Sequence, residues 1–332
     1  MNIWKYVVFA SFLALVSCNE KGNTEGRLST EKKKFLPPSS GTHAEMVIVC
    51  SDDLWEGTVG EFLLKVFGQE QYGLPQSEGI FSLNRVRPEG FQGLLKRAKS
   101  LVFVEIGDSA FIKTQTNVWA QPQVVTTLVA PTKKGLLVLL NKNKDALVSI
   151  YHKADLGVVR GRMKGNTYKS LPKGLRKMGI KKMYLQEGFI NTLDKDDIQI
   201  FRQDTRKTTQ FLVFYKRPIT EESLAGTDII AARDTIGKYY FQGQADNSYF
   251  ATEKLFPPKQ FTTQIDDQFA IETRGLWMAE NDFMGGPFLS YSIYNDAENE
   301  ILTVEGIVYG PDAKKRDIIL EMEAMMTSIK FK

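Results

Sequence analysis

The chain has 332 residues, of which 42% are hydrophobic and 25% are charged, and its formal net charge at pH 7 is +4. This composition is typical of a globular protein long enough for two domains. It excludes a collagen, a disordered chain, a coiled-coil rod and a polytopic membrane protein. With two Cys and two His, the chain cannot be a disulfide scaffold or a cysteine-based zinc module, and we expect neither a metal nor a cofactor.

Residues 1–18 have the pattern of a bacterial lipoprotein signal peptide. Lys5 precedes an apolar run over 6–16, about half of the ~20 residues that a membrane-spanning helix needs. Ser17 then precedes Cys18 as in a lipobox, where the cysteine takes a diacylglycerol and, after cleavage, a fatty acid such as palmitate on its amine. We therefore expect Cys18 to be lipidated. The alternative is an ordinary signal peptide that contains a cysteine.

The expected lipid group determines the location of the protein. Two or more acyl chains anchor a protein stably to a membrane, so we expect a lipid-anchored protein of the bacterial cell envelope, with the outer membrane favoured. Whether it faces the periplasm or the cell surface stays open. Residues 19–43 are polar and contain Gly, Ser and Pro, which predicts a flexible tether between the anchor and the folded part.

A first domain is predicted over 44–172. An apolar strand is expected first, then a helix that starts with a capping box at Asp53 and Glu56. Alternating strands and helices follow, which predicts a sheet with helices packed on it. The expected segments are a strand at 44–50, an apolar helical stripe at 55–67, a strand at 80–86, a short helix at 88–98, strands at 101–106 and 124–129, and helices over about 132–163.

A second domain is predicted over 173–332, after a soft linker around 165–179. Three strands followed by a helix occur here twice, separated by a long irregular loop. The expected segments are strands at 189–193, 197–202 and 208–215, a helix at 221–236, the loop at 238–265, strands at 269–278, 288–294 and 301–309, and a helix at 313–329. The fold class is therefore expected to be α+β, with two mixed sheet-plus-helix domains.

The charge is concentrated in one segment. Residues 133–183 contain fourteen Lys or Arg and two Asp or Glu, a net charge of +12, whereas residues 184–332 have a net charge of −8. One interpretation is binding to anionic lipid, lipopolysaccharide or an acidic envelope protein, with Arg160, Arg162 and Lys164 as candidates. The other is a solvated helix face whose charge is offset by pairing with the acidic second domain. Nucleic acid does not suit an exported lipoprotein.

A second candidate site lies near a Gly-Gly turn. The chain lacks the usual catalytic motifs of hydrolases, metalloproteases and nucleotide-binding enzymes, so no catalytic residue is assigned. Six residues that could bind a ligand nevertheless occur close together in the sequence. They are Arg274, Trp277, Glu280, Asp282, Gly285 and Gly286. The two carboxylates suit acid–base chemistry and Arg274 suits an anion, but the same residues also suit an exposed turn.

Several short motifs resemble one known family. They are Val-Ile-Val-Cys-Ser-Asp-Asp-Leu-Trp-Glu-Gly at 47–57, Leu-Pro-Gln-Ser-Glu at 74–78, Arg-Gly-Leu-Trp at 274–277, Met-Gly-Gly-Pro-Phe at 284–288 and Glu-Gly-Ile-Val-Tyr at 305–309. From about residue 42 to its end, the chain resembles the uncharacterised Bacteroidota lipoprotein family called domain of unknown function 4837. The family tends to have a second Pro where this chain has Ser77. The resemblance implies a lipoprotein with a two-part α+β body and no known activity.

The sequence thus favours a lipid-anchored envelope protein with a binding or assembly role. The alternative is a hydrolase of envelope glycan or peptide that uses the carboxylates near Gly285 and Gly286. The absence of a nucleophilic motif makes an enzyme the less favoured interpretation.

Overall fold

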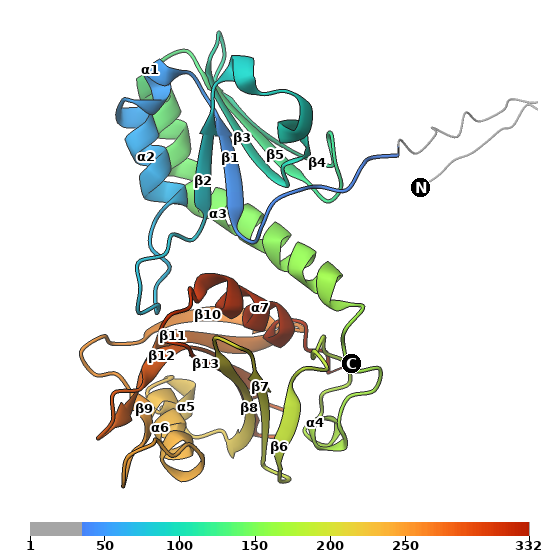
Figure 1. Cartoon of the computed structure of the whole chain (residues 1–332), viewed down its shortest axis with the longest axis vertical. Helices are drawn as coiled ribbons and strands as arrows, with labels where there is room; N and C mark the ends of the chain where they lie inside the picture. The colour runs from blue at the N-terminus through green and yellow to red at the C-terminus, as the bar shows by residue number, and fades with distance from the viewer. Residues whose placement is uncertain (1–34, 332) are drawn as a thin grey trace, which may run out of the picture. The chain divides into compact units, whose positions relative to one another are not determined.

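The structure is a computed structural model that describes residues 35–331. The expected signal peptide, Cys18 and most of the expected tether lie outside the described residues. Residues 36–332 form one compact unit, which contains two β-sheets with helices packed on them (Figure 1). The predicted α+β class is therefore confirmed. No helix in residues 35–331 is both long and apolar enough to cross a membrane.

The first sheet has five strands in the order β2-β1-β3-β5-β4. Its strands are β1 Glu45–Val49, β2 Ser82–Val86, β3 Ser100–Ile106, β4 Phe111–Thr116 and β5 Val124–Ala130. All pairs are parallel except β4 with β5. The inner strands β1, β3 and β5 are apolar along most of their length because parallel strands are covered on both faces.

Three helices and two short 3-10 turns belong to this sheet. They are α1 Asp52–Trp55, α2 Thr58–Phe67, the 3-10 turns Pro88–Gly90 and Gly93–Arg97, and α3 Lys133–Met163. The predicted capping box is wrong, because Asp53 lies inside α1 after the N-cap Ser51. The Asp53 carboxylate instead pairs with Lys133 at the start of α3.

Helix α3 contributes to the cores of both sheets. It begins after Thr132, whose hydroxyl accepts a hydrogen bond from the Gly135 N–H, and its 31 residues extend over about 46 Å. Its part up to Tyr151 buries Leu136, Leu140, Leu147 and Tyr151 in the core of the first sheet. Its C-terminal part buries Leu156, Val159 and Met163 in the core of the second sheet. One helix therefore connects the two sheets by packing as well as by sequence.

The second sheet has eight strands, all paired antiparallel, in the order β10-β11-β12-β13-β8-β7-β6, with β9 on β11. Its strands are β6 Ile190–Asp194, β7 Ile198–Asp204, β8 Thr209–Pro218, β9 Tyr249–Thr252, β10 Lys259–Ile265, β11 Gln268–Glu280, β12 Gly285–Asn295 and β13 Glu300–Tyr309. Its helices are α4 Lys173–Lys177, α5 Glu221–Leu224, α6 Ile229–Tyr240 and α7 Arg316–Met326.

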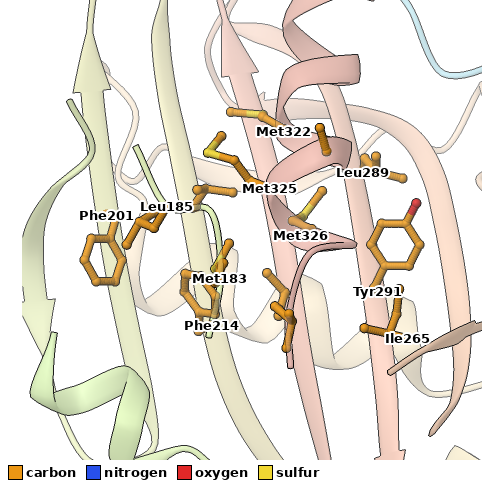
Figure 2. Close-up of a cluster of buried hydrophobic side chains, with 14 of the residues drawn as sticks. Met183, Leu185, Phe201, Phe214, Ile265, Leu289, Tyr291, Met322, Met325 and Met326 are labelled. Carbon is orange, nitrogen blue, oxygen red and sulfur yellow. The ribbon is translucent and has the colours of Figure 1, made fainter. Parts of the chain in front are cut away.

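Helix α7 packs on one face of this sheet through methionines. Figure 2 shows Met322, Met325 and Met326 pointing toward the side chains of the strands. A Cβ atom at Gly306 of β13 would lie 2.8 Å from the Met322 sulfur, so glycine there lets the helix approach the sheet. The opposite face carries a separate aromatic cluster around Trp277 and Phe250.

Three strands differ from the sequence analysis. The region 238–265 was expected to be an irregular loop, but it contains β9 and β10. β10 has mostly exposed side chains and pairs with β11 at the edge of the sheet, so it lacks the apolar run that indicates a buried strand. β4 at 111–116 was missed for the same reason, since its residues are almost all exposed.

Candidate functional site

The cations of the basic segment are mostly exposed and unpaired. Of the fourteen, only Arg160 is not exposed. Among these fourteen cations, only Lys133 and Lys177 form ion pairs within residues 35–331, at 2.6 Å from Asp53 and 2.7 Å from Asp196. The acidic second half of the chain therefore leaves most of these charges uncompensated at close range. Pairing with the acidic second half of the chain, which was the alternative, accounts for one of these two ion pairs, Lys177 with Asp196.

Three lysines form a line along α3. Lys142, Lys153 and Lys164 are each exposed and follow one another at intervals of eleven residues. Eleven residues are close to three helical turns, so the three side chains leave the helix on one side at intervals of about 16 Å. Lys144 and Arg162 leave it on a different side. The cations therefore surround α3, and Lys142, Lys153 and Lys164 lie along one of its faces.

Two of the three predicted basic site residues make internal contacts. Arg160 is half-buried and donates from Nε to the Ala324 carbonyl at 3.1 Å and from its guanidinium to the Thr327 hydroxyl. Burial lowers the pKa of Arg160. Arg162 donates to the Gly41 carbonyl at 3.3 Å. Arg160 thus stabilises the end of α7, whereas Lys164 is available to a partner.

Arg274 lies in a buried ionic cluster. We use this name for His152, Glu272, Arg274, Tyr291 and Glu323. Arg274 Nε is 2.5 Å from Glu272 Oε1, and its terminal nitrogen is 2.7 Å from Glu323 Oε2. Glu323 Oε1 lies 2.5 Å from His152 Nε2 on α3, and the Tyr291 hydroxyl donates to Glu272 at 3.0 Å. The guanidinium is therefore already occupied and cannot hold a substrate anion.

The charges in this cluster stabilise one another. Burial disfavours the charged form of Glu323, but Arg274 and His152 outweigh it and lower its pKa from 4.5 to about 2. Burial also opposes the charge on His152, but the Glu323 carboxylate raises the pKa of His152 above 6.5. In the same way, Glu323 and Glu272 raise the pKa of Arg274 despite its burial. The ionic cluster joins α3, α7 and β11 in one network.

Trp277 and the Gly-Gly turn are structural. Trp277 is buried, stacks on Phe250 with ring centroids 4.0 Å apart, and donates from Nε1 to the Val308 carbonyl at 3.1 Å. A Cβ atom at Gly286 would lie 2.1 Å from that same carbonyl oxygen. A side chain at position 286 would therefore clash with the Val308 carbonyl, which accepts the hydrogen bond from Trp277. Gly285 is the first residue of β12 and pairs with β11.

The two carboxylates proposed for catalysis are not joined by Arg274. Glu280 ends β11, with its carboxylate 3.8 Å from the Lys254 ammonium. Asp282 accepts from the backbone N–H groups of Gln244 at 2.8 Å and Phe283 at 2.7 Å, and these bonds lower its pKa. Arg274 precedes Glu280 by six residues of one strand, a distance of roughly 20 Å. The hydrolase alternative therefore lacks the common site that it requires.

A buried ion pair between Lys99 and Asp155 was not predicted from the sequence. Their side chains are 3% and 2% exposed, and the Lys99 ammonium contacts Asp155 Oδ1. A signal was present, because Asp155 is one of two acidic residues in a strongly basic segment and lies four positions after the buried Tyr151. A charged residue on the apolar face of a helix requires a partner.

Comparison with known families divides the chain after α3. Residues 39–164 match a family model described as Domain of unknown function (DUF8532), and residues 170–328 match one described as Domain of unknown function (DUF4837). No curated protein matches the chain. The motifs quoted from the first half thus fall within the DUF8532 match. The resemblance to DUF4837 is confirmed for residues 170–328, which match the model of that family, whereas residues 39–164 match the other model.

Proposed function

We propose that the protein is a lipid-anchored module of the bacterial envelope that binds phosphate groups at a membrane surface. Cys18 carries the lipid, and the tether keeps the folded unit near the membrane. The lysine line of α3 (Lys142, Lys153 and Lys164) and the cations after it make the contact. The observation that carries the proposal is that these cations are exposed and mostly unpaired.

Electrostatics favours a surface partner over a pocket ligand for these cations. Each lysine or arginine near an anionic membrane contributes about 1 kcal/mol of attraction, which decays within the Debye length of about 10 Å at 0.1 M salt. A lipid anchor raises the effective concentration of the basic segment at the membrane. Weak individual contacts are then sufficient, and no deep binding site is required.

The test uses the compact unit, residues 36–332, without the anchor. Binding is measured by co-sedimentation with vesicles of phosphatidylglycerol, vesicles that carry lipopolysaccharide, and vesicles of phosphatidylcholine alone. We expect binding to one or both anionic vesicles, weakening as salt rises, and none to phosphatidylcholine. The two anionic vesicles distinguish a phospholipid from lipopolysaccharide as the source of the phosphate.

Charge-matched variants test the position of the contact. Lys142→Gln, Lys153→Gln and Lys164→Gln together should remove about 3 kcal/mol of attraction, a weakening of roughly 100-fold. The control changes three exposed lysines elsewhere, Lys113, Lys207 and Lys314, to Gln and has the same net charge. If both sets of substitutions weaken vesicle binding equally, binding depends on net charge alone and the proposed contact through the lysine line is wrong. Failure to bind any anionic vesicle, with binding to poly-glutamate instead, would point to an acidic protein partner and refute the proposal.

A further inference from the structure

A cavity of about 440 Å³ lies between α3 and the ends of three strands of the first sheet. Its wall on the helix side is formed by Ala154, Asp155, Gly157 and Val158, and Lys99 and Val124 belong to the sheet side. The volume is within the range of small-molecule sites, about 300–1,000 Å³. None of these residues belongs to the lysine line, so the cavity is independent of the proposed membrane contact.

The charged part of the cavity wall is the buried Lys99–Asp155 pair, and the uncharged polar residues Ser100, Thr116, Asn117 and Gln123 also line the cavity. Asp155 Oδ1 is bound to the Lys99 ammonium, but Asp155 Oδ2 is buried and has no hydrogen-bond partner among the described residues. Burial raises the pKa of Asp155, although Lys99 opposes this effect. A buried carboxylate oxygen without a partner is costly, since most such atoms in proteins are satisfied.

Lys99 also lines a pocket of about 230 Å³, but of these two spaces only the large cavity also borders Asp155. On its other side Asp155 borders a space of about 10 Å³, shared with the ionic cluster, which is no larger than one water needs. Gln123 also lines the large cavity, but its amide is already used. It donates to the carbonyls of Lys96 and Ala98, both at 2.7 Å, and accepts from the Trp119 N–H at 2.9 Å.

We propose that this cavity binds a neutral, mainly apolar small molecule with one hydroxyl or amide group. That group accepts a hydrogen bond from Lys99 and donates one to Asp155 Oδ2. The pair has no net charge, so an ionised ligand group would leave an uncompensated charge in a buried place. The apolar remainder of the ligand contacts Val124, Ala154 and Val158.

The first experiment fills the cavity. The probe is N-phenyl-1-naphthylamine, an uncharged aromatic amine with one N–H that fluoresces in apolar sites, added to residues 36–332. Gly157 lines the cavity, and a Cβ atom there meets nothing within 4 Å. Gly157→Leu should therefore fold normally and weaken probe binding at least tenfold. Gly161→Leu is the matched control, because Gly161 lies one turn later on α3 and its Cβ also meets nothing within 4 Å.

The second experiment tests the ligand class by competition. The probe is displaced with 1-octanol, octanoate or octylammonium, which share one chain and differ in the charge of the polar group. We expect 1-octanol to compete at least tenfold better than either ion. Lys99→Met combined with Asp155→Leu replaces the pair by apolar groups and should abolish this preference. Equal competition by the three compounds, or equal probe binding by the Gly157→Leu and Gly161→Leu variants, would refute the proposal.

Discussion

Glu323 is the central residue of the ionic cluster, and its replacement by Gln is the sharpest test of how the two sheets are joined. Glu323 lies on α7 and bonds to both His152 on α3 and Arg274 on β11. Glu323→Gln keeps the size of the side chain but removes its charge. Arg274 then keeps Glu272 as its ion-pair partner, and His152 loses the carboxylate that favours its protonated form.

The magnitude follows from the pKa of Glu323. Its decrease from 4.5 to about 2 corresponds to about 3 kcal/mol at about 1.36 kcal/mol per pKa unit. This agrees with the 3–5 kcal/mol that is typical when one partner of a buried ion pair is removed. We therefore expect Glu323→Gln to lower the free energy of unfolding by about 3 kcal/mol at pH 6, measured by urea denaturation of residues 36–332.

The pKa shifts of Glu323 and His152 determine how the stabilisation by the ionic cluster changes with pH. Because the folded-state pKa of Glu323 is lowered, its contribution is present above pH 4.5 and is lost as the pH falls toward about 2. The pKa of His152 is raised, so its contribution is complete below 6.5 and is lost as the pH rises through the folded-state value. The difference between the original protein and the variant should be largest between about pH 4.5 and 6.5.

Glu321→Gln is the matched control on the same helix. Burial and the nearby Asp317 raise the pKa of Glu321, so removing its charge should cost nothing at neutral pH or stabilise the protein slightly. The ionic cluster would not stabilise the fold if Glu321→Gln and Glu323→Gln lowered the free energy of unfolding equally. The same conclusion would follow if the decrease caused by Glu323→Gln were equal at pH 3 and pH 6.

Two further predictions concern the anchor and the Gly-Gly turn. Cys18→Ser should abolish lipid labelling and release the full chain from the membrane fraction, and retention after a high-salt wash would contradict lipidation of Cys18. Gly286→Ala should lower the midpoint of thermal unfolding, because the added Cβ would lie 2.1 Å from a backbone oxygen, with a cost of about 1–3 kcal/mol. Gly161→Ala, whose Cβ meets nothing within 4 Å, should raise the midpoint instead.

The parts of the fold that the sequence predicted are those with a strong local pattern. β1, β3 and β5 are apolar runs covered on both faces, and such runs indicate buried strands. β4 and β10 have mostly exposed side chains. These two segments are strands because they form hydrogen bonds with a neighbouring strand, and the hydrophobic pattern of a segment does not predict that pairing.

The candidate sites were harder to predict because their contacts are long-range. The His152–Glu323 contact joins residues 171 positions apart, and the Lys99–Asp155 pair spans 56. Arg274 was expected to share a site with Glu280 and Asp282 because the three residues are close in the chain. In the extended strand β11, each residue adds about 3.3 Å of length, so Arg274 lies far from Glu280. Its ion-pair partners are instead Glu272 and Glu323.

The position of α3 explains why the two family matches occur in one compact unit. The DUF8532 match ends at residue 164 and therefore includes Leu156, Val159 and Met163. These three side chains are nevertheless buried in the core of the second sheet. Cutting the chain between the matches would expose them to water, at a cost of roughly 1.5–3 kcal/mol for each fully buried side chain. It would also separate His152 from Glu323. The hydrophobic packing and the ionic cluster therefore act in the same direction, and both hold α3 against α7.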